Sequence, residues 1–361
     1  MNQVVTALTS LLALAQIAVD DAPVPRVKSP VRLSDWMRDM IDDIGDMALR
    51  DIAIAGSHNS GSYAIDPRSK RLSGDFDGQY KGLKPFVEHQ TPLAAVVSKF
   101  AKCQRNPILH QLENGVRYLD VRMHYEYLGR DSVGTLELCH SLCAIDYKVF
   151  ARQVVQFVEA HPGEVVIVDV NHVYAEGAHI DDCKDQILEM IVDSLGRTRI
   201  ADSTLSPESP LRDFVNHRRN IVLVYQYASS AARSNIWAGN AIQSRWTESR
   251  NDQDILDRGF RQVIDRDRYS LHVMQLVVAY GADEILNGLT MDDVPCSTLV
   301  MGRNLTSTVP SFILGHCESS STFLRNVNIV MVDDSSLNGH ALAMALLSVN
   351  FMKSRLPKPR R

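Results

Sequence analysis

Short apolar runs alternate with helical segments along most of this 361-residue chain, and that alternation restricts the folds open to it. Parallel strands joined by crossover helices produce such a pattern. Because no linker interrupts the series, we expect one closed α/β barrel of the TIM type rather than an open doubly wound sheet. Strands are predicted at residues 51–55, 116–121, 135–138, 165–170, 220–225, 271–279 and 328–332. Helices are predicted at residues 34–48 (with Ser34 as N-cap), 148–160, 181–196, 253–263, 310–325 and 341–352.

Polar side chains stand at the ends of several of these runs. His58 follows the first strand, His140 follows the third, and Asp120 and Arg122 share one face at the end of the second. Catalytic side chains of such barrels lie at the carboxyl ends of the strands, so we expect these four residues and Asp333 to meet. One imidazole can remove a proton, the other can supply one, and the guanidinium can hold a phosphoryl charge. Either histidine alone fits a structural role equally well; the four together favour cleavage of a phosphodiester.

The order of these motifs resembles the X-domain family of phosphatidylinositol-specific phospholipases C, above all its small X-domain-only proteins. The motifs that carry the likeness are Gly-Ser-His-Asn at 56–59, Arg-Tyr-Leu-Asp-Val-Arg at 117–122, Cys-His at 139–140, and His-Pro-Gly-Glu followed by an apolar strand at 161–169. The likeness runs from about residue 33 to about residue 352. It implies a distorted, incomplete catalytic barrel at 31–355, between a leader at 1–30 and a basic tail at 356–361.

The resemblance also implies a reaction. In the family, the inositol 2-hydroxyl attacks the phosphorus and yields a cyclic inositol phosphate and diacylglycerol. Carried over, His58 is the general base and His140 the general acid, because an imidazole pKa near 6.5 suits both roles. Arg122 then neutralises the phosphate oxygens, and Asp120 orients Arg122 and His140. Asp333 is expected to fix the tautomer of His58, with neighbouring Asp334 as the alternative; either aspartate also suits the cap of the following turn.

Arg122 decides the expectation about metals. In the calcium-dependent branch of the family this position holds a carboxylate that binds the ion. A guanidinium there repels a divalent cation, so the resemblance implies an enzyme without a metal or other cofactor. Asn59 points the other way, since the calcium branch carries Asn after its histidine, but one neutral amide does not anchor calcium beside an arginine.

Five residues are expected to line the substrate pocket: Asn59, Asp169, Asn171, Tyr225 and Trp246. Asp169 and Asn171 fit equally well a structural role, closing a layer of the barrel by hydrogen bonding. The long connection at residues 69–90 either covers the mouth of the active site or is a surface loop.

The composition restricts the partners of the chain. A formal net charge of −5 argues against nucleic acid as a partner. No apolar run approaches the roughly 20 residues that span a bilayer, so we expect peripheral contact with a phospholipid surface. Residues 4–19 resemble the apolar part of a signal peptide, but no basic residue precedes them. Secretion and a cytoplasmic location with peripheral membrane contact therefore both stay open, and the sequence does not predict an oligomeric state. Six scattered cysteines form no Cys-x-x-Cys pair, so no structural zinc site is expected.

Two other readings stay open. The first is a metal-dependent phosphodiesterase barrel of the glycerophosphodiesterase or sphingomyelinase D type, which Arg122 disfavours and which dependence on a metal would reveal. The second is a catalytically silent domain that binds a lipid headgroup or a partner. Such a domain need not keep both histidines together with Asp120 and Arg122.

Overall fold

The computed structural model describes residues 31–68, 71–77, 80–89, 91–129, 134–228, 236–290 and 296–357. The predicted leader at 1–30 and most of the predicted tail at 356–361 lie outside these ranges. Among the helices described, none combines the length and the apolar character that crossing a membrane requires.

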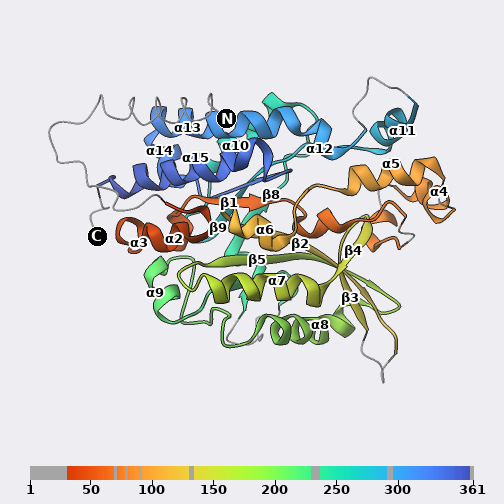
Figure 1. Cartoon of the computed structure of the whole chain (residues 1–361), viewed down its shortest axis with the longest axis horizontal. Coiled ribbons are helices and arrows are strands. Elements are labelled where there is room, and N and C mark those ends of the chain that lie inside the picture. Colours follow the sequence, from red (N-terminus) through yellow and green to blue (C-terminus); the bar gives the residue numbers. More distant parts are fainter. Residues whose placement is uncertain are drawn as a thin grey trace. The chain divides into compact units, whose positions relative to one another are not determined.

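A curled sheet of parallel strands forms the centre of the fold (Figure 1). The two terminal strands of its path, β7 and β8, do not pair with each other within the described part of the chain, so the barrel is open at that seam. The prediction of a distorted, incomplete TIM-type barrel is therefore confirmed. Along the path the strands are β7 (Trp237–Ala238), β6 (Ile221–Tyr225), β5 (Val166–Glu176), β2 (Val116–Glu126), β1 (Ile54–Ser57), β10 (Ile329–Val332), β9 (Leu271–Leu276) and β8 (Ile242–Arg245).

Two groups of helices cover the outer face of the sheet, on opposite sides of it in Figure 1. α7 (Tyr147–Ala160) and α8 (Ile180–Leu195) bury their apolar faces against β2, β5 and β6. α10 (Asp252–Ile264), α13 (Arg303–Ser319), α14 (Ser321–Asn326) and α15 (Leu337–Ser354) do the same against β1, β9 and β10. Burial of these faces supplies the main stabilisation of such a layered fold. The shorter helices are α6 (Ile108–Glu113), α9 (Leu211–Asn216), α11 (Ala282–Thr290), α12 (Thr298–Met301), η2 (Leu49–Asp51), η3 (Ser60–Ala64) and η6 (Gly239–Ala241).

The strand predicted at 135–138 differs from the expected βα alternation. β3 (Thr135–His140) pairs antiparallel with β2, and β4 (Leu142–Asp146), which the sequence did not predict, pairs antiparallel with β3. β2 runs to Glu126, beyond its predicted end, and β3 folds back on this extension with Met123 opposite Leu138. Because β3 runs antiparallel to β2, His140 at the end of β3 lies next to the part of β2 that carries Arg122.

Two predicted helices have different limits in the structure. In place of one helix at 34–48 the chain forms η1 (Leu33–Asp35), α2 (Trp36–Asp39) and α3 (Ile41–Ile44). Ser34 is no N-cap, because its hydroxyl bonds the neighbouring Asp35 and the distant Glu164 accepts the N–H groups of Met37 and Arg38. The helix predicted at 310–325 is instead the pair α13 and α14, and Pro310 lies inside α13.

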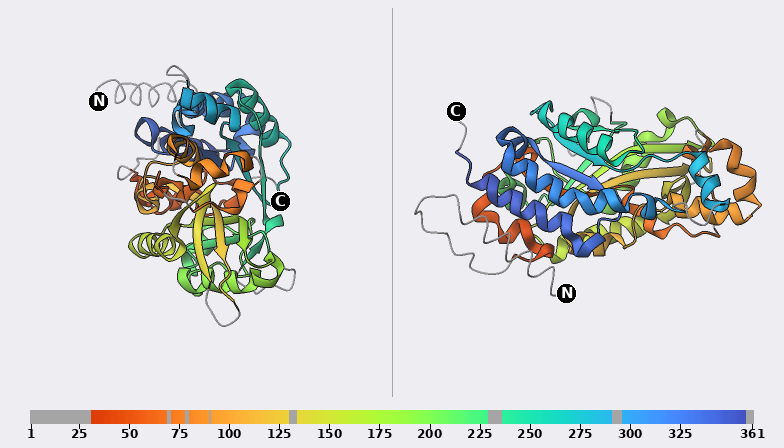
Figure 2. Two further views of the ribbon diagram at one scale, coloured as in Figure 1. Left: turned by 90° about the vertical axis from the view of Figure 1, so that its right-hand side faces the viewer. Right: turned by 90° about the horizontal axis from the view of Figure 1, so that it is seen from above.

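The connection predicted at 69–90 is packed against the β3–β4 hairpin where the structure describes it. It contains η4 (Gly74–Asp77), η5 (Lys81–Leu83) and α4 (Lys84–Glu88), and α5 (Pro92–Ala101) follows. Leu72 forms a bridge with Leu142, and the Ser73 N–H donates to the Ser141 carbonyl at 3.1 Å. In the views of Figure 2 these segments occupy one end of the barrel, together with α11.

The interior of the barrel is polar because β2 and β5 alternate. Val168 and Val170 face outward into the core shared with α7 and α8, whereas Tyr118 and Asp169 meet inside. The Tyr118 hydroxyl donates to Asp169 Oδ2 at 2.8 Å. A side chain at Gly56 would place its Cβ 2.8 Å from the Tyr118 ring, so glycine in β1 is what allows the tyrosine to fill this space.

Candidate active site

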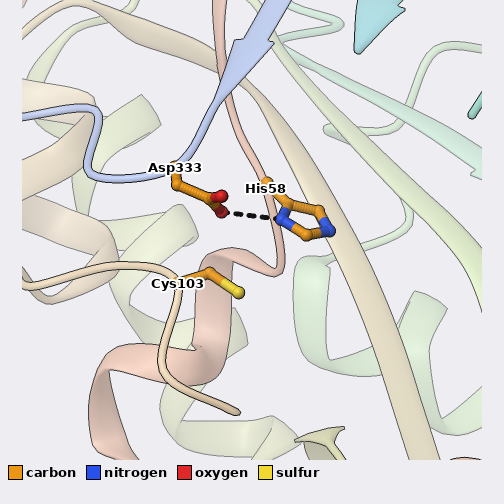
Figure 3. A group of neighbouring side chains, drawn as sticks. All are labelled: His58, Cys103 and Asp333. Carbon is orange, nitrogen blue, oxygen red and sulfur yellow. Dashed lines mark hydrogen bonds and ion pairs between the residues drawn. The ribbon is translucent and has the colours of Figure 1, made fainter. Parts of the chain in front are cut away.

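His58 follows β1 at the mouth of the barrel and is held from both ring nitrogens. Its Nδ1 bonds Asp333 Oδ1 at 2.7 Å (Figure 3). Its Nε2 lies 2.8 Å from Asn59 Nδ2. A carboxylate accepts and an amide nitrogen donates, so the proton of the neutral ring lies on Nδ1 and Nε2 carries the lone pair. In this tautomer Nε2 can accept a proton.

The two adjacent aspartates after β10 have separate contacts. Asp333 bonds His58, whereas Asp334 Oδ2 accepts from Arg105 Nε at 2.6 Å and Asp334 Oδ1 accepts from the Ser336 hydroxyl at 2.7 Å. Asp333 is thus the hydrogen-bond partner of His58, and Asp334 caps the turn that follows β10.

Asp120 hydrogen-bonds the loop after β1 instead of the charged side chains of Arg122 and His140 that we expected. Its Oδ2 accepts the Asn59 N–H at 2.6 Å, its Oδ1 accepts from Asn171 Nδ2, and Oδ2 lies 4.0 Å from His58 Nε2. Among the described residues it hydrogen-bonds neither Arg122 nor His140, so the prediction that it orients them through hydrogen bonds is wrong. Burial acts to raise the pKa of Asp120, but His58, Arg122 and the donated hydrogen bonds outweigh it and leave the pKa below its ordinary value.

His140 lies beside His58 in an edge-on arrangement, with ring centroids 5.9 Å apart. Its Nδ1 donates to the Ala101 carbonyl at 2.8 Å, which leaves Nε2 as the nitrogen available for chemistry. Burial, followed by the charge of Arg122, lowers the pKa of His140 to about 4, although Asp75 acts in the opposite direction. The ring is therefore neutral near pH 7 in the absence of an anion.

Asp75, in η4, is a site residue that sequence reasoning missed. Its Oδ2 accepts the N–H of Ser141 at 2.7 Å, directly after His140, where Ser141 adopts a left-handed φ of 61°. Asp75 is also among the charges that act on Arg122 and His140. No motif surrounds it in the sequence, and only packing of the 71–77 segment against β3 and β4 reveals it.

Arg122 lies near His140 and carries a buried donor without a partner among the described residues. Its guanidinium is largely buried, Nε has no hydrogen-bond partner, and no ion pair within 4 Å involves it among the described residues. The carboxylates of Asp120 and Asp75 attract it from a greater distance. A buried guanidinium with unused donors is suited to receive an anion.

Asp169 and Asn171 line the inner face of β5. Asn171 donates to Asp120, and Asp169 accepts from Tyr118 and, at 3.4 Å, from Gln226 Nε2. Burial raises the pKa of Asp169 to about 7. Both residues therefore connect β5 to β2 through hydrogen bonds.

Tyr225 and Trp246 do not join this cluster. Tyr225 lies on the outer face of β6, where its hydroxyl donates to the Lys184 carbonyl of α8 at 3.0 Å. Trp246 is half exposed and lines a surface pocket against α10 with Arg258 and Arg261. The expectation that these two residues line the substrate pocket was incorrect because alternation along β6 turns Tyr225 outward and Trp246 lies beyond the end of β8.

Two further residues between α5 and α6 lie at the site. Gln104 joins the ends of β1 and β10: its Nε2 donates to the His58 carbonyl at 3.1 Å and to the Val332 carbonyl at 3.0 Å. Cys103 is fully buried, and its Sγ lies 3.5 Å from His140 Nδ1. Burial, with the charge of Asp333, raises the pKa of this thiol well above its ordinary value, so the sulfur is protonated.

Comparison with known proteins finds similarity to one family. The family model described as PI-PLC X 1 matches residues 79–237. The curated relatives include PI-PLC X domain-containing protein 3 of Danio rerio, 25% identical over 266 residues that cover 73% of this chain and 79% of the relative. Another is PI-PLC X domain-containing protein 2 of Homo sapiens, 23% identical over 265 residues that cover 73% and 83%. Residues 79–237 of this chain are thus similar to the PI-PLC X family, and these relatives are PI-PLC X domain-containing proteins by name.

Proteins named phospholipase C are also similar to this chain. The variant-surface-glycoprotein phospholipase C of Trypanosoma brucei brucei is 25% identical over 242 residues, which cover 64% of this chain and 63% of that protein. The solved phosphatidylinositol-specific phospholipase C of Listeria monocytogenes superposes with a TM-score of 0.56 at 15% identity, covering 88% of this chain and 99% of the other. The F249X mutant of the Staphylococcus aureus enzyme gives 0.57 at 16% identity, with the same coverage. These solved structures show the fold of the barrel.

Proposed function

We propose that this protein is a phosphoric diester hydrolase that cleaves phosphatidylinositol-type lipids by histidine acid–base catalysis, without a metal. The observation that carries the proposal is the pair of histidine rings, 5.9 Å apart between centroids, near Arg122, whose buried Nε has no hydrogen-bond partner among the described residues. Similarity to proteins that are named phospholipases C supports the substrate class.

In this mechanism His58 Nε2 removes the proton of the inositol 2-hydroxyl, and the oxygen attacks phosphorus. In the free protein Asn59 Nδ2 donates a hydrogen bond to His58 Nε2, so the substrate hydroxyl must displace that amide. Asp333 stabilises the imidazolium that forms, through its bond to Nδ1. The products of this step are a cyclic inositol phosphate and diacylglycerol.

His140 supplies the proton that the departing glycerol oxygen needs. Because its Nδ1–H is donated to a carbonyl, Nε2 must gain a proton before it can act as the acid. A bound phosphodiester neutralises Arg122, which is one of the two largest causes of the low pKa of His140. Substrate binding therefore raises the pKa of His140, so that Nε2 gains the proton that it later donates to the glycerol oxygen.

The lipid is proposed to be reached by peripheral contact at a membrane surface. Because the chain has a net charge of −5, we expect membrane binding to depend on exposed apolar side chains and not on electrostatic attraction to anionic lipids. Binding to vesicles should then weaken little as the salt concentration rises.

One experiment tests the function. Purified protein is incubated with vesicles of single phospholipids, with and without excess EDTA, and water-soluble phosphate esters are measured. We expect cleavage of phosphatidylinositol that survives chelation, and a loss of at least ~100-fold in His58→Ala and His140→Ala with the fold intact. Activity that disappears with EDTA and returns with a divalent ion would favour the glycerophosphodiesterase or sphingomyelinase D type. Absence of turnover on every lipid would favour a silent binding domain.

A further inference from the structure

Cys103 occupies a position that the proposed reaction does not use. It follows α5 and lies under the histidine pair, where its Sγ receives a weak contact from Asn59 Nδ2 at 3.7 Å. Its sulfur, a ring nitrogen of His58 and a carboxylate oxygen of Asp333 all lie within 4.8 Å of one another, and Figure 3 shows the three side chains converging. A nitrogen, a sulfur and an oxygen donor therefore share one small space.

The carboxylate of Asp333 provides a second, independent observation. Asp333 is 2% exposed, and while Oδ1 bonds His58, Oδ2 is buried without any hydrogen-bond partner. An unsatisfied buried carboxylate oxygen is costly, and a cation is the group that satisfies it best. The orphan atom belongs to the same cluster as the thiol.

We propose that His58, Cys103 and Asp333 form an inhibitory zinc site. A thiolate and an imidazole select Zn²⁺ over calcium or magnesium, and a carboxylate completes a donor set that zinc accepts. Metal-ligand distances of about 2.0–2.3 Å place tetrahedral donors about 3.5 Å apart, so side-chain rotation must bring the sulfur closer and open the 2.7 Å hydrogen bond between His58 and Asp333. Three protein ligands leave a fourth position for water, and the ion enters from the mouth, where His58 is 11% exposed.

Binding changes the protons of the site in a defined way. The Cys103 thiol loses its proton to solvent as the sulfur–zinc bond forms. His58 must release the proton on Nδ1 to bind the ion there, and the ring regains one on Nε2, so the imidazole stays neutral. Nε2 then carries a hydrogen and no longer accepts the proton of a substrate hydroxyl. This effect on turnover rests on the proposed function, whereas metal binding does not.

Metal binding is tested first, with Co²⁺ as a spectroscopic substitute for Zn²⁺. The reduced, full-length protein is titrated with Co²⁺ and the thiolate-to-cobalt charge-transfer absorption is recorded. We expect one equivalent to produce the band, Zn²⁺ to abolish it, and Cys103→Ser to lack it. The matched control is Cys296→Ser, which removes a thiol outside the site and should keep the band. No band in the unaltered protein, or an undiminished band in Cys103→Ser, overturns the proposal.

Inhibition is tested second, on phosphatidylinositol vesicles. Zn²⁺ should inhibit the unaltered protein, and Cys103→Ser should need at least about tenfold more Zn²⁺ for half-inhibition, with the inhibition of each protein referred to its own rate without metal. Equal sensitivity of the two proteins would refute the inhibitory role. Should the protein cleave no lipid at all, the proposed function fails, and the cobalt titration still decides whether the zinc site exists.

Discussion

Replacing Asp333 with asparagine isolates the charge behind His58. The side chain keeps its size, but the 2.7 Å bond to His58 Nδ1 no longer joins a carboxylate to the imidazolium that forms during the reaction. A hydrogen bond to a charged group contributes about 1.5–3 kcal/mol. At 1.36 kcal/mol for each tenfold in rate, kcat should fall by about 10- to 150-fold. We expect the fold to be retained, because Asp333 Oδ2 has no partner to lose.

The matched control is the same substitution at the next residue. Asp334 pairs with Arg105, which is half exposed, and its φ of 47° is one that asparagine tolerates. Asp334 bonds Arg105 and Ser336 and, among the described residues, hydrogen-bonds neither histidine, so Asp334→Asn should keep turnover within about threefold of the unaltered protein.

The assay measures initial rates of cyclic inositol phosphate release from phosphatidylinositol vesicles in excess EDTA, and thermal unfolding is recorded for each variant. A loss of turnover in Asp333→Asn at an unchanged melting temperature supports a role in catalysis. The reasoning is refuted if Asp333→Asn keeps more than about a third of the activity, or if Asp334→Asn loses as much.

Three further outcomes follow from the buried charges. Glu164→Gln should lower the free energy of unfolding by about 3 kcal/mol in urea titrations, because it leaves the fully buried Arg117 without its counter-charge; an unchanged midpoint would contradict this. In the folded protein the pKa of Asp169 is about 7, against 3.8 for the free carboxyl. Its ionisation therefore lowers the free energy of unfolding progressively from about pH 4 to pH 7, and by a constant amount at higher pH. Asp169→Asn should thus gain stability relative to the unaltered protein over that window, by a few kcal/mol at pH 9, and a difference independent of pH would count against it. Arg122→Met should raise the pKa of His140 from about 4, which NMR titration of labelled histidine measures. An unchanged or lower pKa of His140 would mean that the charge of Arg122 does not lower it.

The Glu164 prediction also explains a motif that the sequence highlighted without a role. The carboxylate of Glu164 accepts two bonds from Arg117 and the N–H groups of Met37 and Arg38. It therefore ties the amino end of α2 to β2 and β5 beneath the barrel. The His-Pro-Gly-Glu segment is a structural clamp, remote from the site in which the histidines meet.

Local patterns in the sequence were sufficient for the parts of the fold that depend on neighbouring residues. Alternating apolar runs predicted the parallel strands, and helical periodicity predicted α7, α8, α10 and α15 close to their observed limits. Because the carboxyl ends of parallel strands share one edge, the same patterns placed His58 and Arg122 together with the strand that carries Asp333.

Only the tertiary structure decided the contacts between segments far apart in the chain. The antiparallel return of β3 brings His140 to the site, and its direction depends on pairing with the extended end of β2, which no local pattern encodes. Asp75 and Cys103 reach the histidines from connections without a motif, through packing of those segments against the barrel mouth. The choice between Asp333 and Asp334 likewise follows from the course of the backbone after β10, which turns one carboxylate inward to His58 and the other toward Arg105. A sequence shows which side chains a strand end carries, but hydrogen bonds across the barrel depend on the direction in which each backbone leaves its strand.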